Sequence, residues 1–70
     1  MANSTILLLQ SNIKKYRTEK KLSQEVLSEK AGISCDYLSE IERGRKTPSI
    51  KRLCLIADAL EIDVYKLFMQ

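Results

Sequence analysis

The chain has 70 residues with 12 Lys and Arg, 9 Asp and Glu, two Cys and no His, for a formal net charge of +3. This length accommodates one small domain, residues 1–70. Without His there is neither a Ser-His-Asp or Cys-His catalytic unit nor an ordinary Cys/His zinc site. We therefore expect a binding protein rather than an enzyme, with no metal and no cofactor.

The sequence offers no signal for a membrane or for export. Its longest apolar run, residues 6–9, is far shorter than the roughly 20 residues that cross a bilayer. Cys35 and Cys54 are too few for a disulfide framework and indicate reduced thiols. These features predict a cytoplasmic protein that contacts no membrane.

The charge is unevenly distributed along the chain. Residues 1–52 contain 11 basic and 6 acidic side chains, a net charge of +5, whereas residues 53–70 have a net charge of −2. A positive first part favours contact with a polyanion there and a different role for the end of the chain.

Apolar residues at three- and four-residue spacing predict an all-α fold of five helices. Few Gly and Pro residues interrupt them, and each predicted helix after the first follows a residue that caps helices well. The expected helices are about 5–20, 24–31 after Ser23, 35–43 after Ser34, 50–60 after Ser49 and 64–69 after Asp63. Ser4 or Thr5 caps the first of them.

The segment at about 24–43 has the pattern of a helix-turn-helix motif. Two short helices are joined by a turn that contains Gly32, a residue that accepts the left-handed conformation after a helix. Leu38 and Ile41 are expected to face the core, and Ile50 is expected inward on the fourth helix. Periodicity does not distinguish this arrangement from another small helical bundle.

Five short segments, in order and at fixed spacing, resemble one family. They are LSQE at 22–25, AGIS at 31–34, YLSEIERG at 37–44, PSI at 48–50 and IADAL at 56–60. Over residues 13–67 the chain is similar to the Cro/C1-type helix-turn-helix family, also called the xenobiotic-response-element family, of bacterial and phage transcriptional regulators. The resemblance implies a compact, five-helix, lambda-repressor-like domain that binds duplex DNA. It places the helix at about 35–43 in the major groove and the helix at 24–31 across the backbone.

The resemblance also implies which residues reach bases: Cys35, Asp36, Ser39 and Glu40. Carboxylates accept hydrogen bonds from cytosine N4, so Asp36 and Glu40 would select cytosine. Structural interpretations remain open for both. Asp36 is an acid in the first turn of a helix, and Glu40 can pair with Arg43 three residues later.

A second set of residues is implied at the phosphates: Gln24, Ser34, Tyr37, Arg43, Arg45 and Lys46. Gln24 begins a helix, where backbone N–H groups attract an anion. No Arg, Gln or Asn occupies the first turns of the recognition helix, so we expect affinity to depend on phosphate contacts. Family pattern also pairs Arg17 with Glu42 as a partly buried structural ion pair, although Arg17 could instead be solvated or contact a phosphate.

Three positions depart from the family pattern. Ser28 stands where Ala is usual, Cys54 could join the core edge, and Cys35 at a base-contact position leaves redox control open. An apolar patch of Leu55, Ile62, Val64 and Phe68 is expected to form a two-fold dimer with recognition helices about 34 Å apart. The alternative is packing of this patch onto Leu7 and Leu8 in a monomer.

Together these features predict a sequence-specific, double-stranded-DNA-binding transcriptional regulator. We expect a homodimer on a palindromic operator, with no small-molecule ligand. In size the chain resembles phage repressors and the controllers of restriction–modification operons. The alternative, favoured by the acidic recognition face, is a protein-interaction module such as an antitoxin or adaptor with secondary DNA binding.

Overall fold

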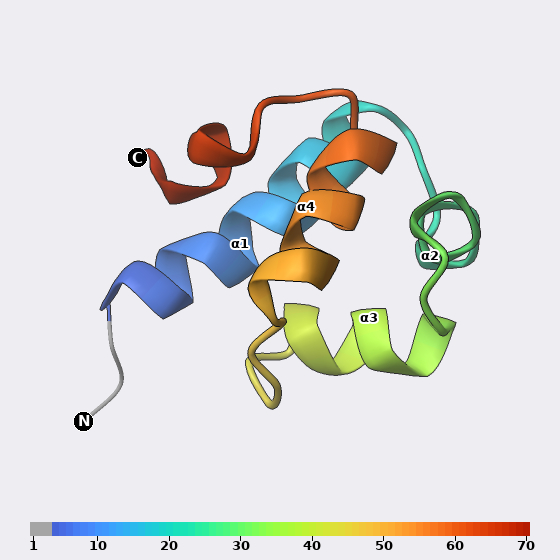
Figure 1. Cartoon of the computed structure of the whole chain (residues 1–70), viewed down its shortest axis with the longest axis horizontal. Helices are drawn as coiled ribbons and strands as arrows, with labels where there is room; N and C mark the ends of the chain where they lie inside the picture. Colours follow the sequence, from blue (N-terminus) through green and yellow to red (C-terminus); the bar gives the residue numbers. More distant parts are fainter. Residues whose placement is uncertain (1–3) are drawn as a thin grey trace.

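The computed structural model describes residues 4–70, which form four α-helices and one short 3-10 helix and contain no strand. The elements are α1 (Ser4–Glu19), α2 (Gln24–Ala31), α3 (Cys35–Glu42), α4 (Ile50–Ala59) and η1 (Val64–Phe68). The long α1 runs diagonally through the molecule, with α2 and α3 to its lower right and η1 to its upper left (Figure 1). The predicted all-α fold is confirmed. No helix in this span is long and apolar enough to cross a membrane.

The prediction of a fifth α-helix is corrected by the structure, because residues 64–68 form a 3-10 helix instead. Its bonds have three-residue spacing, from Lys66 N to Asp63 O and from Met69 N to Lys66 O. A segment this short cannot form enough four-residue bonds to favour an α-helix. Asp63 precedes it as expected, but its side chain makes no capping hydrogen bond.

Three serines begin the middle helices as the sequence predicts. The side chains of Ser23, Ser34 and Ser49 accept hydrogen bonds from the backbone N–H three residues ahead, at 3.0–3.2 Å. Each bond satisfies one of the donors that a helix N-terminus leaves without a partner. The starts of α2, α3 and α4 are therefore determined by local sequence.

The core receives apolar side chains from all five elements. Its buried members are Leu9, Ile13, Leu27, Ala31, Leu38, Ile41, Leu53, Ile56, Ala57, Leu60 and Leu67. Two expectations on α4 were wrong: Ile50 is 73% exposed, and Cys54 lies in solvent rather than at the core edge. Ile50 begins α4 one full turn before Leu53, the first residue of that helix in the core.

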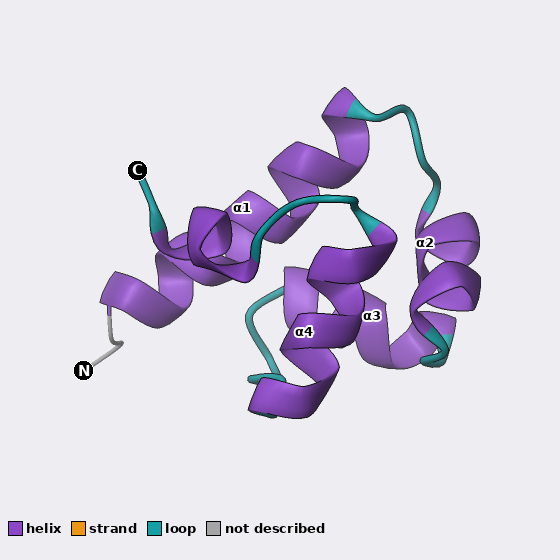
Figure 2. Ribbon diagram, turned by 45° about the horizontal axis from the view of Figure 1, so that its top comes forward, coloured by secondary structure: helices purple, strands orange, loops and turns teal. Residues whose placement is uncertain are grey.

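Two buried polar side chains on α1 connect it to distant segments. Asn12 Nδ2 donates to the carbonyls of Leu67 and Met69, at 2.8 and 2.7 Å. Gln10 Nε2 donates to the Lys46 carbonyl at 3.4 Å. The two Asn12 bonds hold η1 alongside the N-terminal half of α1 (Figure 2).

Candidate nucleic-acid interface

The turn between α2 and α3 consists of residues 32–34. Gly32 has φ +71°, and its N–H donates to the Glu29 carbonyl at 3.2 Å. The Ile33 N–H donates to the Ser28 carbonyl at 3.0 Å. These two bonds give carbonyls at the end of α2 hydrogen-bond partners before Ser34 begins α3. A Cβ at Gly32 would meet no atom within 4 Å. Backbone conformation, not space, is therefore the reason for glycine here.

Helix α3 has one face in the core and one face outward. Leu38 and Ile41 are completely buried. The predicted base-contacting residues lie off that face: Asp36 is exposed, and Cys35, Ser39 and Glu40 are half-buried. The structure thus brings all four to the outer surface of one helix, and their roles toward bases stay predictions.

Predicted phosphate contacts and one further cation line a groove beside α3. Two cations lie over the Tyr37 ring, with Lys46 Nζ 5.7 Å and Arg52 Cζ 5.5 Å from its centroid. The groove, about 450 Å³, is lined by residues 32–34 and by Asp36, Tyr37, Glu40, Lys46 and Arg52. Sequence reasoning missed Arg52. The sequence feature that could have identified Arg52 is Ser49, because Ser49 caps α4 and so places Arg52 in the first turn of that helix.

The basic loop after α3 has a fixed backbone and exposed side chains. The Glu40 carbonyl accepts from both Arg45 N and Lys46 N, at 2.9 and 3.3 Å. Gly44 at φ +81° allows this reversal. Arg43, Arg45 and Lys46 are exposed, so three cations project from a loop that is anchored at both ends.

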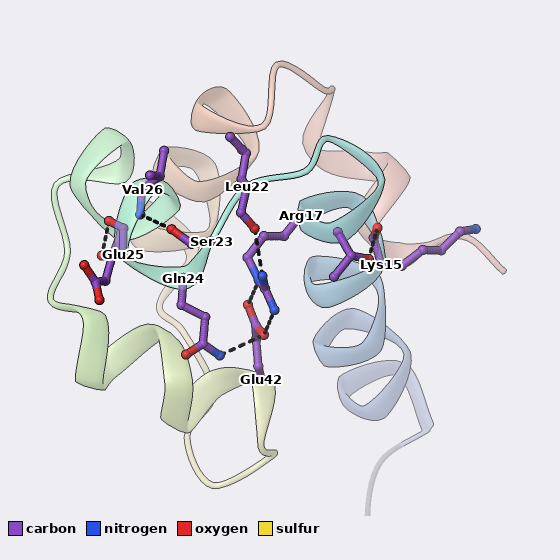
Figure 3. Close-up of polar contacts among 10 residues, drawn as sticks. Lys15, Arg17, Leu22, Ser23, Gln24, Glu25, Val26 and Glu42 are labelled. Carbon is purple, nitrogen blue, oxygen red and sulfur yellow. Dashed lines mark hydrogen bonds and ion pairs between the residues drawn. The ribbon is translucent and has the colours of Figure 1, made fainter.

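A buried ion pair joins α1 to the end of α3 (Figure 3). Arg17 Nε lies 2.8 Å from Glu42 Oε2, and Arg17 Nη2 donates to Glu42 Oε1 at 3.0 Å. Their side chains are 12% and 3% exposed. Arg17 Nη1 also donates to the Leu22 carbonyl at 2.8 Å. The structure therefore brings together the ion pair that the resemblance implies. Through Arg17, the pair is also bonded to the segment that connects α1 and α2.

Gln24 belongs to the same network. Its Nε2 donates to Glu42 Oε1 at 3.1 Å (Figure 3), an interaction that the sequence did not predict. A side-chain amide has a second N–H, which can donate to a phosphate at the start of α2. The predicted phosphate role of Gln24 is thus compatible with its contact to Glu42.

The structure separates the four residues of the predicted dimer patch into two kinds. Leu55 and Phe68 are 38% and 40% exposed, whereas Ile62 and Val64 are half-buried and pack against the core. The two exposed residues lie on α4 and η1, which contact each other. Tyr65 and Met69, which sequence reasoning did not single out, are also exposed apolar residues at this end.

An all-α domain with this capped helix pair and adjoining basic loop is a helix-turn-helix domain. Residues 13–67 match the helix-turn-helix family, so the chain belongs to that family, and the resemblance drawn from its motifs is confirmed. The immunity repressor protein of Bacillus phage phi105 is 50% identical over 52 residues, which are 74% of this chain and 36% of the repressor. Because the chain also spans only 55% of the regulator SinR of Bacillus subtilis, it matches part of these longer relatives.

Solved structures agree with this assignment. The restriction-modification controller protein C.AhdI from Aeromonas hydrophila superimposes with a TM-score of 0.89 at 30% identity, over 94% of this chain and 100% of that one. The structure of SinR in complex with DNA superimposes with a TM-score of 0.82 at 40% identity, over 87% of this chain and 98% of that one.

Proposed function

We propose that this chain is a transcriptional regulator that binds double-stranded DNA at specific sequences and performs no catalysis. The observation that carries the proposal is the juxtaposition of the outer face of α3 with four cations: Arg43, Arg45, Lys46 and Arg52. Cations beside a helix that fits the major groove can neutralise the flanking phosphates. The similarity to SinR, whose structure was solved in complex with DNA, supports DNA binding by this chain.

In this proposal α3 enters the major groove and α2 crosses the backbone. Cys35, Asp36, Ser39 and Glu40 face base edges. The phosphate contacts are Gln24, Ser34, Tyr37, Arg43, Arg45 and Lys46, to which the groove geometry adds Arg52. The Tyr37 ring positions two cations at once, because Lys46 and Arg52 both lie against it.

We further propose a homodimer that binds a palindromic site. Leu55 and Phe68 expose apolar surface on adjacent elements, and a two-fold axis through such a patch would make it self-complementary. Ile62 and Val64 support this surface from beneath, since both pack against the core. Two recognition helices about 34 Å apart would then read successive major grooves on one side of the duplex.

The test is selection from a randomised duplex pool at several salt concentrations, with the mass of the complex recorded. We expect a palindromic site, two chains per duplex, and log K that falls with log salt by about 0.9 per neutralised phosphate. Weak, sequence-blind binding that appears only at low salt would refute the proposal and favour the protein-interaction alternative.

Charge reversal gives the matched comparison. Arg45→Glu should weaken binding to every duplex, because Arg45 is an exposed cation in the loop after α3. Lys66→Glu makes the same change on η1, which lies on the opposite side of the molecule from α3 (Figure 1). We expect Lys66→Glu to retain affinity, and the mass measurement shows separately whether it still dimerises. Equal losses in the two variants would contradict the placement of the DNA surface.

A further inference from the structure

One side chain of α1 bonds to the backbone at the end of η1. Asn12 Nδ2 donates to the carbonyls of Leu67 and Met69, at 2.8 and 2.7 Å, and Asn12 is only 5% exposed. A side-chain amide has two N–H groups, so both donors can be used at once. The last carbonyls of a helix receive no donor from that helix. Asn12 therefore supplies from α1 what η1 cannot supply for itself.

The two bonded carbonyls lie on either side of Phe68. The Leu67 side chain is completely buried, whereas the Phe68 ring is 40% exposed. Packing of Leu67 in the core holds the inner side of η1, but apolar packing is not directional. Hydrogen bonds are directional, so the Asn12 bonds determine how the backbone around Phe68 is oriented. The direction in which Phe68 leaves the surface depends on them.

The short length of η1 makes this external attachment important. Val64–Phe68 is a five-residue 3-10 helix, and Asp63 before it makes no side-chain capping bond. A 3-10 helix has poorer hydrogen-bond geometry than an α-helix, and so short a segment is not stable in isolation. Its arrangement must come from the elements that it contacts, which are α1 and α4.

The surface that η1 presents is apolar. Tyr65 and Met69 are 55% and 54% exposed, and Leu55 on the adjoining α4 is 38% exposed. With Phe68 they lie at the end of the molecule away from α3 (Figure 1), so this surface stays accessible when α3 lies against DNA. Three of these four residues lie on η1 or directly after it, and their placement depends on how η1 is held.

We propose that Asn12 is a positioning residue for the homodimer: it holds η1 so that Phe68 meets a second copy of the chain in a fixed orientation. This role rests on the homodimer proposed above. A two-fold interface uses the same surface of both protomers, so a loosened η1 weakens it twice. Apparent affinity falls with the fraction of each protomer that has the competent arrangement. If η1 is correctly placed about one third of the time, the dimer Kd rises about tenfold.

The experiment compares the full chain with its Asn12→Ala variant at a temperature where circular dichroism shows both to be folded. Sedimentation equilibrium gives the dimer Kd, which should rise about tenfold or more in the variant. Binding is then measured on the palindromic duplex that the wild type selects and on a duplex with one half-site. Asn12→Ala should bind the half-site like the wild type and the palindrome more weakly, because α2 and α3 are unchanged.

Gln10→Ala is the matched control. Gln10 is also 5% exposed on α1, and its amide also donates to a distant carbonyl, that of Lys46 in the basic loop, at 3.4 Å. We expect the opposite pattern: an unchanged dimer Kd and weaker binding to the half-site. A purely structural role of Asn12 predicts instead that both variants change the two measurements in the same proportion.

A measurement on the unmodified chain tests the contact without any variant. In the wild-type monomer at low concentration, the two Asn12 side-chain N–H protons should exchange slowly with solvent by NMR, because η1 is already held before association. Dimerisation should change their exchange little. Fast exchange in the monomer would overturn the proposal, as would an unchanged dimer Kd in Asn12→Ala.

These outcomes are distinguishable from a failure of the homodimer itself. Phe68→Ala removes exposed apolar surface directly and should raise the dimer Kd. If the wild type stays monomeric both in solution and on the palindrome, the homodimer proposal fails, and the role of Asn12 fails with it. If Phe68→Ala weakens the dimer and Asn12→Ala does not, only the role of Asn12 is wrong.

Discussion

Replacing Arg17 by Met should remove much of the stability of this domain. Met keeps the length and apolar stem of Arg but cannot pair with Glu42, whose side chain is 3% exposed. The substitution deletes both bonds to that carboxylate and the bond to the Leu22 carbonyl. Gln24 would be the one remaining side-chain hydrogen-bond partner of Glu42 among the described residues.

The magnitude follows from leaving a buried charge without its counter-ion. Removing one partner of a buried pair costs about 3–5 kcal/mol. A domain of this length has a total stability of about 4–10 kcal/mol. The variant should therefore lose about half of its free energy of unfolding, and its Tm should fall by about 12 °C or more.

Urea and thermal unfolding, followed by far-ultraviolet circular dichroism, measure this loss. The double variant Arg17→Met/Glu42→Leu removes both charges, and we expect its stability to return to within about 2 kcal/mol of the wild type. The result that would refute the reasoning is a loss below about 1 kcal/mol in Arg17→Met, because that is the behaviour of an exposed pair.

Four further substitutions test other parts of the fold. Asn12→Ala should cost about 1–3 kcal/mol and speed hydrogen exchange in η1, since it removes the donor to two carbonyls at that end; unchanged exchange would contradict the anchoring role. Gly44→Ala should destabilise more than Gly32→Ala in urea titrations: both have positive φ, but a Cβ at Gly44 would lie 3.2 Å from Gln10 Oε1, whereas one at Gly32 meets nothing within 4 Å. Ser28→Ala should change the free energy of unfolding in urea titrations by about 0.5 kcal/mol or less, because the hydroxyl bonds only to the Glu25 carbonyl in its own helix.

Local chemistry explains what the sequence predicted well. Ser23, Ser34 and Ser49 each accept a bond from a backbone N–H three residues ahead, so the capping signal and the structure involve the same few residues. Gly32 ends α2 for an equally local reason, its positive φ. These signals need no knowledge of what the helix packs against.

Features that depend on distant partners were harder to predict. Asn12 and Gln10 lie among the polar residues of α1, and their partners are main-chain carbonyls on other segments, which leave no mark in the sequence. Ile50 fits the apolar period of α4, yet it is exposed because the helix begins beyond the edge of the core. Periodicity identifies a face but does not say where along the helix that face is covered.

The candidate site shows the same division. Its residues on α3 share a face by helical spacing alone, so sequence could group Asp36, Ser39 and Glu40. The approach of Arg45 to Glu40 and of Arg52 to Tyr37 depends on the loop that joins α3 to α4. That loop turns back through bonds to a backbone carbonyl, which the residue pattern does not encode.

The polar residues of α1 connect the stability of the domain to its binding surface. Arg17 fixes the C-terminal end of α3 through Glu42, and Gln10 bonds to the carbonyl of Lys46 within the basic loop. Both segments belong to the proposed DNA surface, yet neither α1 residue is expected to touch DNA. A substitution at Gln10 should therefore change the position of the loop cations without changing their charge. Gln10→Leu should weaken DNA binding while leaving the number of phosphates neutralised, and hence the salt slope, nearly unchanged. A slope that falls by about 0.9 in this variant would instead mean that a phosphate contact had been lost outright.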